Sequence, residues 1–131
     1  SIRRQRQMCI RDRFIDFGTF VNKDCDYNDY VSQAVEFIQK GECDFAMAFC
    51  RTGQGVNISG NKRKGIRGAL IFDDYTAEHA IRHNSANFFS IPSKYVTPDD
   101  LLIMIEIWSN TTFDGGRHMT RIQKVESYEK I

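Results

Sequence analysis

Continuous apolar runs recur along the chain at the length of single strands. The runs "CDFAMAFC", "GIRGALIF" and "ANFFSIP" contain few polar residues, so each predicts a strand that is buried on both faces. A shorter run, "RFIDFG", predicts another strand that ends at a glycine. In chain order the predicted strands are 13–18, 43–50, 65–72 and 86–92.

Segments with helical spacing of apolar residues separate these strands. The clearest one begins after Thr97, a natural N-cap, and carries Pro98 in its first turn with Asp99 and Asp100 beside it. The predicted helices are 26–42, 74–84, 97–110 and 117–130, with a short helix after the glycine turn at 53–55. Strands that alternate with helices predict an α/β fold, a doubly wound, Rossmann-like parallel sheet in three layers.

Composition narrows the class of protein. With 131 residues, 41% hydrophobic and 27% charged, the chain fits one globular domain. Its net charge of +1 argues against a nucleic-acid partner, and its longest apolar run, "LLIMIEIW", is too short to cross a membrane. No secretion signal is evident, and the four cysteines match no zinc module, so we expect reduced thiols, no metal and a cytoplasmic protein.

Cys50 is the first candidate for chemistry. It lies at the carboxyl end of a predicted strand, where α/β folds bind ligands, and the glycine-rich stretch "CRTGQG" begins there. Amides that open the next helix could cradle an anion. The loop lacks the Walker spacing, Ile58 stands where a dinucleotide fingerprint has its third glycine, and Val56 stands where a cysteine phosphatase has its arginine.

Four interpretations of Cys50 follow. It could be an inert core residue, a redox thiol, a covalent nucleophile or a base that moves a proton. Redox use is disfavoured because no resolving cysteine lies within a few residues. A thiol beside a helix N-terminus ionises more readily, a thiolate can exchange a proton with carbon, and a nearby anion hole would stabilise an enediolate oxygen. The inert alternative stays open on the pattern alone.

Other polar residues have equally ordinary alternatives. Arg117 and Arg121 are four apart, so they share a helix face that could bind a phosphate or could simply be solvated. Imidazole side chains ordinarily exchange protons near neutrality, so His83 could act as an acid, or it could cap a helix end. Tyr27 could line a pocket or be an edge aromatic. His118 is a weaker candidate for contact with the same phosphate, and His79 is expected at the surface.

Five stretches in the correct order resemble the ribose-5-phosphate isomerase B family, within the wider group that includes galactose-6-phosphate isomerase subunits. They are "IDFGT", "DYNDY", "CRTGQGVNISGNKRKGIRGAL", "YTAEHAIRHNSAN" and "FDGGRHMTRIQKV". The resemblance spans about residues 14 to 126. It implies a sugar-phosphate isomerase domain at 14–131 that interconverts an aldose phosphate and a ketose phosphate without metal or cofactor.

The resemblance also implies roles for individual residues. Cys50 would move a proton between C2 and C1, Thr52 would help to hold the enediolate, and His83 would be the acid that opens the sugar ring. Substrate-binding residues would be Tyr27, Gly53, Gln54, Gly55, Asn61, Asn84, Arg117 and Arg121. The favoured substrate is ribose 5-phosphate, and the family implies a homodimer, or a tetramer, with each site shared between subunits.

Two alternatives remain from the sequence. The chain could isomerise a hexose phosphate such as galactose or allose 6-phosphate, since pocket depth is not readable from the motifs. It could also be a non-catalytic subunit that binds sugar phosphate, although the presence of Cys50, Thr52 and His83 argues against this.

Two departures from the family pattern stand out. Arg51 replaces a glycine that commonly follows the cysteine, which adds a cation to the loop. The family also opens with a strand, an Asp-His pair and a helix, whereas only 1–13 precedes "FIDFG" here. We therefore expect the first strand and helix to be missing, sheet edges to be left unpaired and activity to be reduced. Because "RQMCIRDR" resembles a translated sequencing-adapter remnant, we expect 1–13 to be a foreign, non-family segment.

Overall fold

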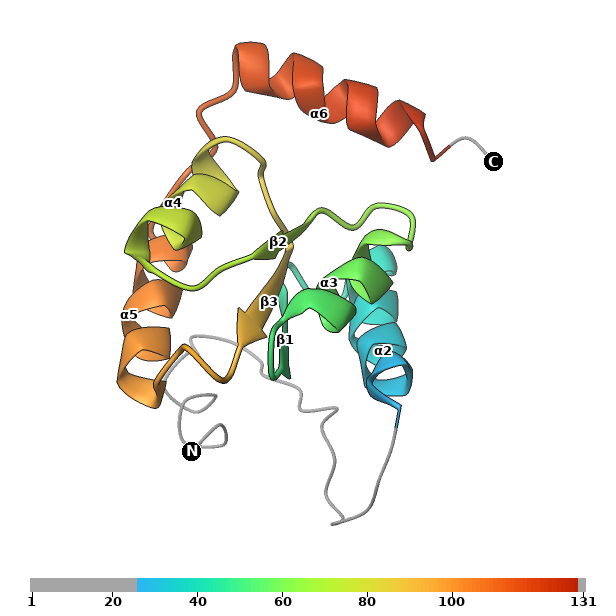
Figure 1. The fold of residues 1–131 in the computed structure, drawn as a ribbon. Helices are drawn as coiled ribbons and strands as arrows, with labels where there is room; N and C mark the ends of the chain where they lie inside the picture. The colour runs from blue at the N-terminus through green and yellow to red at the C-terminus, as the bar shows by residue number, and fades with distance from the viewer. Residues whose placement is uncertain (1–25, 130–131) are drawn as a thin grey trace.

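A three-stranded parallel sheet lies between two pairs of helices in the computed structural model, which describes residues 26–129 (Figure 1). The predicted helices and the strands within this range are all present. The predicted strand at 13–18 and the segment 1–13 lie outside the described residues. In chain order the elements are α2 (Tyr27–Gln39), β1 (Ala46–Cys50), α3 (Gln54–Asn61), β2 (Gly68–Leu70), α4 (Asp74–Arg82), β3 (Phe88–Pro92), α5 (Pro98–Ser109) and α6 (Arg117–Ser127).

The central strand of the described sheet is β3. The strand order is β1-β3-β2, and both pairs are parallel. Phe88 stands opposite Ala46 on β1 and opposite Gly68 on β2, whereas Pro92 stands opposite Cys50. All five residues of β3 are buried, as expected for a strand with a neighbour on each side.

The two outer strands correct one prediction. The runs 43–50 and 65–72 are predicted to form strands buried on both faces. In the structure all five residues of β1 and all three residues of β2 are only half-buried. The reason is their position: among residues 26–129 each has a strand neighbour on one side only. An edge strand cannot be covered as fully as a central one.

Consecutive phenylalanines on β3 show how the layers are built. Phe88 packs toward α2 and α3 in one core cluster, with Val35 and Val56, whereas Phe89 packs toward α4 and α5 in the other. Because successive strand residues point to opposite faces, one strand anchors both helical layers. The Phe89 ring stacks on Trp108 of α5 with centroids 4.1 Å apart. The predicted three-layer arrangement is confirmed.

Helix termini carry the local signals that position the loops. Thr97 caps α5 as predicted, in a capping box with Asp100, and Asp73 forms a second box with Thr76 at the start of α4. Gly115 and Gly116, with φ of 69° and 58°, redirect the chain into α6, which lies across one end of the sheet (Figure 1). In the described part of the chain no helix has the length and apolar character of a membrane span.

Candidate active site

Cys50 is the last residue of β1 and faces the start of α3. Its carbonyl accepts a 2.9 Å hydrogen bond from the amide of Ser93, which fixes the strand end. The amide of Gly53 donates to the Cys50 sulfur at 3.1 Å. A charged acceptor strengthens such a bond, so this amide stabilises the sulfur best when it is a thiolate. The half-buried sulfur therefore lies where the sequence predicted a reactive thiol.

Gly53 makes this turn possible. It is the N-cap of α3 with φ of 73°, a left-handed conformation that side chains rarely adopt. A Cβ there would lie 2.5 Å from Leu70 Cδ1 and 3.1 Å from the backbone nitrogen of Pro92. The loop is thus packed directly over the ends of β2 and β3, and only glycine fits.

Thr52 and the first amides of α3 lie beside the sulfur. The Thr52 hydroxyl accepts a long bond, 3.4 Å, from the amide of Gln54, and no other side-chain cap is found for α3 among the described residues. Amides in the first turn of a helix have no partner within the helix. They are therefore available to an anionic oxygen, as the predicted enediolate hole requires.

Tyr27, the first residue of α2, forms one wall of this loop. Its hydroxyl would lie 2.6 Å from a Cβ placed on Gly55, so the ring rests against that glycine. Asn28 reinforces the contact by donating from Nδ2 to the Ser59 hydroxyl at 3.3 Å. The structure thus brings together Tyr27, Cys50, Thr52, Gly53, Gln54 and Gly55, all at the carboxyl edge of the sheet.

Asn61 lies elsewhere. At the far end of α3 it binds the backbone of Gly68 twice, donating to the carbonyl at 3.1 Å and accepting from the amide at 2.7 Å. Both ends of its side-chain amide are therefore engaged in holding α3 to β2. The structure does not bring Asn61 to the Cys50 loop.

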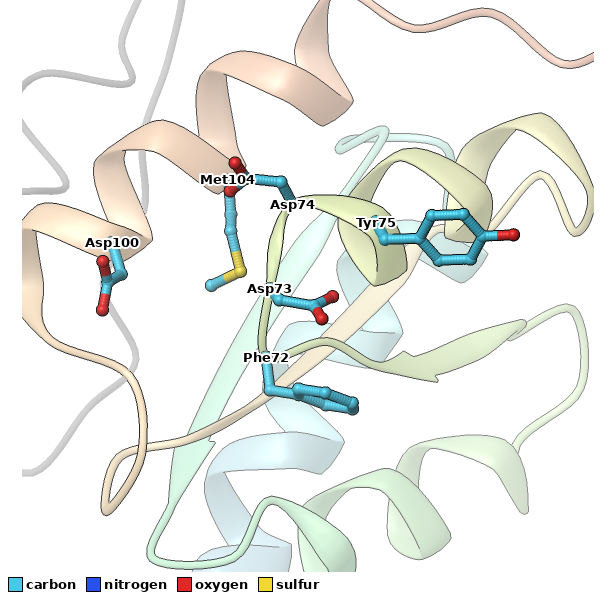
Figure 2. Close-up of a pocket in the computed structure, with 6 residues that line it drawn as sticks. All are labelled: Phe72, Asp73, Asp74, Tyr75, Asp100 and Met104. Carbon is cyan, nitrogen blue, oxygen red and sulfur yellow. The ribbon is translucent and has the colours of Figure 1, made fainter.

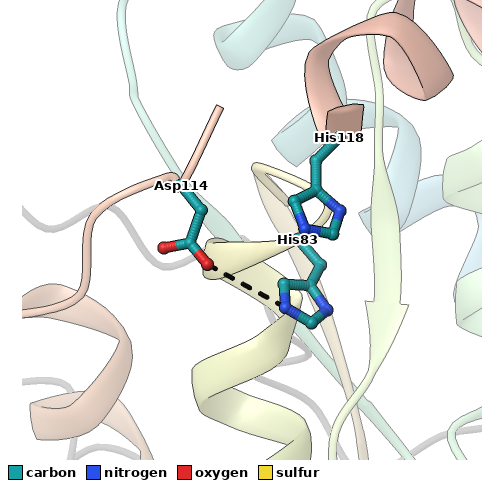
Figure 3. A group of neighbouring side chains, drawn as sticks. All are labelled: His83, Asp114 and His118. Carbon is teal, nitrogen blue, oxygen red and sulfur yellow. Dashed lines mark ion pairs between the residues drawn. The ribbon is translucent and has the colours of Figure 1, made fainter. Parts of the chain in front are cut away.

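His83 belongs to a second cluster, at the end of α4 (Figure 3). Its ring stacks on that of His118, with centroids 4.2 Å apart and planes 10° apart, and meets His79 edge-on at 4.7 Å. Its Nε2 lies 3.9 Å from Asp114 Oδ2. The neighbouring Asn84 is exposed and donates to the His79 carbonyl at 3.4 Å.

Asp114 is the residue of this cluster that the sequence did not single out. The Nε of Arg82 donates to both of its oxygens, at 3.2 and 3.3 Å, and the Asp114 amide donates to the Arg82 carbonyl at 2.9 Å. These bonds to Asp114 are the main reason that the pKa of Arg82 is raised. The acidic residue before "GGRH" was the signal available in the sequence.

Two arginines of α6 stand beside the cluster. Arg117 and Arg121 are exposed, four residues apart, and form no ion pair within the described range. The pKa of His118 is lowered, chiefly by partial burial and then by the positive charges of His83, Arg117 and Arg121, which Asp114 opposes. The local field is therefore positive, and it favours an anion.

The same cluster is poorly arranged for a metal ion. One ligand atom each from His83, Asp114 and His118 lies within 4.8 Å of the others. The two rings are nearly parallel, however, so their nitrogen lone pairs do not converge on one point, as zinc coordination requires. Arg82 also occupies both oxygens of Asp114.

The two clusters lie at opposite ends of the sheet (Figure 1). Cys50 stands beside the last residue of β3, whereas His83 ends α4 at the other edge, in the connection that leads to Phe88, the first residue of β3. Five strand residues separate these edges by roughly 13 Å. Within one chain, therefore, Cys50 and His83 cannot act on the same small molecule.

A groove of about 390 Å³ opens at the carboxyl edge, beyond β2 (Figure 2). None of the predicted site residues lines it. Exposed Phe72 and Tyr75 stand beside the starts of α4 and α5. The lining residues are Phe72, Asp73, Asp74, Tyr75, Asp100 and Met104.

Comparison with known proteins identifies the family. Residues 6–125 match the model described as ribose/galactose isomerase. The chain belongs to the ribose/galactose isomerase family. Its predicted enzyme class, an isomerase, and its α/β fold are confirmed at this level. The match includes part of the segment 1–13, and the boundary predicted at residue 13 stays a prediction.

Relatives of known name support the same family. YwlF of Bacillus subtilis, named only as a candidate sugar phosphate isomerase, is 38% identical over 126 residues, which cover 92% of this chain and 82% of YwlF. Ribose-5-phosphate isomerase B of Escherichia coli is 31% identical over 116 residues, which cover 88% of this chain and 78% of that enzyme. The structure of Clostridium thermocellum ribose-5-phosphate isomerase B has a TM-score of 0.85 at 39% identity, and the match covers 88% of this chain and 78% of that structure.

Proposed function

We propose that this member of the ribose/galactose isomerase family interconverts ribose 5-phosphate and ribulose 5-phosphate. The observation that carries the proposal is the 3.1 Å hydrogen bond from the Gly53 amide to the Cys50 sulfur, beside the open amides of α3. A base and an anion site are thereby adjacent, as an enediolate mechanism needs. The relatives named as ribose-5-phosphate isomerase B favour the pentose substrate.

The proton transfer follows from this geometry. The Cys50 thiolate takes the proton from C2 of the open aldose, and the electron pair passes to the carbonyl oxygen to give an enediolate. The Gly53 amide supports the thiolate, whereas Thr52 and the amides of Gln54 and Gly55 hold the oxygen that becomes negative. The thiol then returns the proton to C1, while the hydroxyl protons rearrange, which leaves a ketone at C2. Nothing is oxidised or reduced overall.

The second cluster supplies the remaining functions. Arg117 and Arg121, which form no ion pair among residues 26–129, bind the phosphate in the positive field described above. His83 gives a proton to the ring oxygen when the cyclic sugar opens. Asn84 contacts a sugar hydroxyl, and Tyr27 lines the pocket from the Cys50 side.

A site made from two copies of the chain accommodates both clusters. Because roughly 13 Å of sheet separates Cys50 from His83 in one chain, each site takes the Cys50 loop of one subunit and the His83 cluster of another. The smallest such assembly is a homodimer with two equivalent sites. Light scattering on the purified chain tests this directly, since a monomer would have no complete site.

The chemistry also favours a reducing compartment, the cytoplasm. Cys43 and Cys50 are both free thiols, and Cys50 must remain reduced to serve as a base. Cys43 lies in the same run of sequence but outside the glycine loop. It therefore offers a matched control for substitution of Cys50.

The test is formation of ketose from ribose 5-phosphate by the purified chain. We expect Cys50→Ala to lower turnover by about a hundredfold to ten-thousandfold, the usual contribution of a general base, and Cys43→Ala to stay near the starting value. Equal activity of the two variants would refute the role of Cys50. Activity on galactose or allose 6-phosphate alone would indicate the hexose alternative, and binding without turnover would indicate a non-catalytic subunit.

A further inference from the structure

We infer that Asp114 is a positioning residue that, together with His118, fixes the orientation of His83 for opening the sugar ring. The inference rests on the proposed function, in which His83 is the ring-opening acid. It concerns a residue that does not touch the substrate and acts only through the imidazole.

The first argument is that Asp114 is itself held rigidly. Arg82 Nε donates to both carboxylate oxygens, and the Asp114 amide donates to the Arg82 carbonyl at 2.9 Å. Side chain and backbone are thus both tied to the last residue of α4, the residue before His83. A carboxylate anchored in this way keeps a fixed place relative to the imidazole, even though Asp114 belongs to the loop before α6.

The second argument is that the imidazole is confined on more than one side (Figure 3). His118 covers one face of the His83 ring at 4.2 Å, and His79 meets it edge-on at 4.7 Å. Asp114 Oδ2 then lies 3.9 Å from Nε2. Ring plane and ring rotation are therefore both restricted, and such preorganisation is what a proton-transfer group needs.

The third argument concerns which nitrogen is left free. At 3.9 Å the carboxylate is beyond hydrogen-bond reach of Nε2 but close enough to attract its proton. Because Asp114 faces Nε2, Nδ1 is the ring nitrogen left to face the substrate and exchange a proton with it. In ring opening the C1–O4 bond breaks, O4 receives a proton from His83, and the C1 hydroxyl releases one to water.

Two assays distinguish ring opening by His83 from the proton transfer between C2 and C1 by Cys50. Conversion of ribose 5-phosphate requires ring opening, because the aldose is mostly cyclic. Ribulose 5-phosphate cannot form the corresponding ring, because its O5 carries the phosphate. Uptake of deuterium from D2O at C1 of the ketose therefore reports on Cys50 and the enediolate without any ring step.

The variant to compare is Asp114→Asn, which keeps the size of the side chain and removes its charge. We expect aldose isomerisation to fall by roughly tenfold to a hundredfold, the range found when the partner that orients a metal-binding histidine is removed. Deuterium uptake should stay within about twofold of the starting value. The matched control is Glu36→Gln, which removes a carboxylate that also pairs with an arginine, Arg63 at 3.8 Å, but is not a member of the His83 cluster. It should leave both reactions unchanged.

A double variant completes the test. If Asp114 acts only through the imidazole, His83→Asn combined with Asp114→Asn should isomerise the aldose no more slowly than His83→Asn alone. Additive losses, an equal fall of both reactions in Asp114→Asn, or no fall at all would overturn the inference. An unsubstituted chain that performs neither reaction would refute the proposed function and, with it, this inference.

Discussion

Replacing Gly53 by alanine tests whether the Cys50 loop is held by close packing. A left-handed backbone destabilises a residue with a Cβ by about 1–2 kcal/mol. The new Cβ would also lie 2.5 Å from Leu70 Cδ1 and 3.1 Å from the Pro92 nitrogen. The leucine methyl can shift but the Pro92 backbone cannot, so overpacking adds about 1–3 kcal/mol. We expect Gly53→Ala to lower the free energy of unfolding by about 2–5 kcal/mol.

Gly41 provides the matched control. It has nearly the same φ, 74° against 73°, but a Cβ there would meet nothing within 4 Å. Gly41→Ala should therefore show the backbone strain alone, about 1–2 kcal/mol. Urea titrations of the two variants at one protein concentration measure the difference. If Gly53→Ala is destabilised no more than Gly41→Ala, close packing of the loop over β2 and β3 is not what requires glycine.

Two further predictions concern α6. Arg117→Ala and Arg121→Ala should each raise KM for the sugar phosphate by roughly tenfold to a hundredfold with little change in kcat, because each removes a charge-assisted bond to phosphate. Lys124→Ala on the same helix is the control. An equal rise of KM in that variant would show that the overall charge of the helix, and not a specific bond, is responsible. Because the folded-state pKa of His118 lies below its ordinary 6.5, the unfolded chain takes up a proton at His118 at a higher pH than the folded chain does. The stability present above about pH 6.5 should therefore decline as the pH falls. Thermal unfolding against pH, with His118→Gln for comparison, measures this, and an identical decline in the variant would assign it to other groups.

The sequence predicted features that depend on neighbouring residues. Thr97 was recognisable as an N-cap because its capping partner, Asp100, lies three residues later in the chain. The Cys50 loop was recognisable because its glycines follow the cysteine closely. Burial of β1 was overestimated, since an apolar run does not reveal whether a strand has one neighbour or two. The capping box of Asp73 with Thr76 was missed, although both residues were visible in the sequence.

Contacts between distant segments were beyond the reach of periodicity. Asp114 meets Arg82 across 32 residues, and nothing in the spacing of either residue indicates the pair. Asn61 shows a second contact that periodicity does not reveal: the resemblance implies a place near the sugar, which stays a prediction, and in the structure both ends of its amide bind the Gly68 backbone. A motif shows that a residue type is present, but the fold decides which partners are within reach.

The distance between Cys50 and His83 along one sheet has a genetic consequence. In an assembly whose sites each combine one residue from either copy, a chain lacking Cys50 still contributes a sound His83, and a chain lacking His83 still contributes a sound Cys50. Two inactive alleles expressed in the same cell would then restore activity in mixed assemblies, whereas one chain carrying both substitutions would rescue neither.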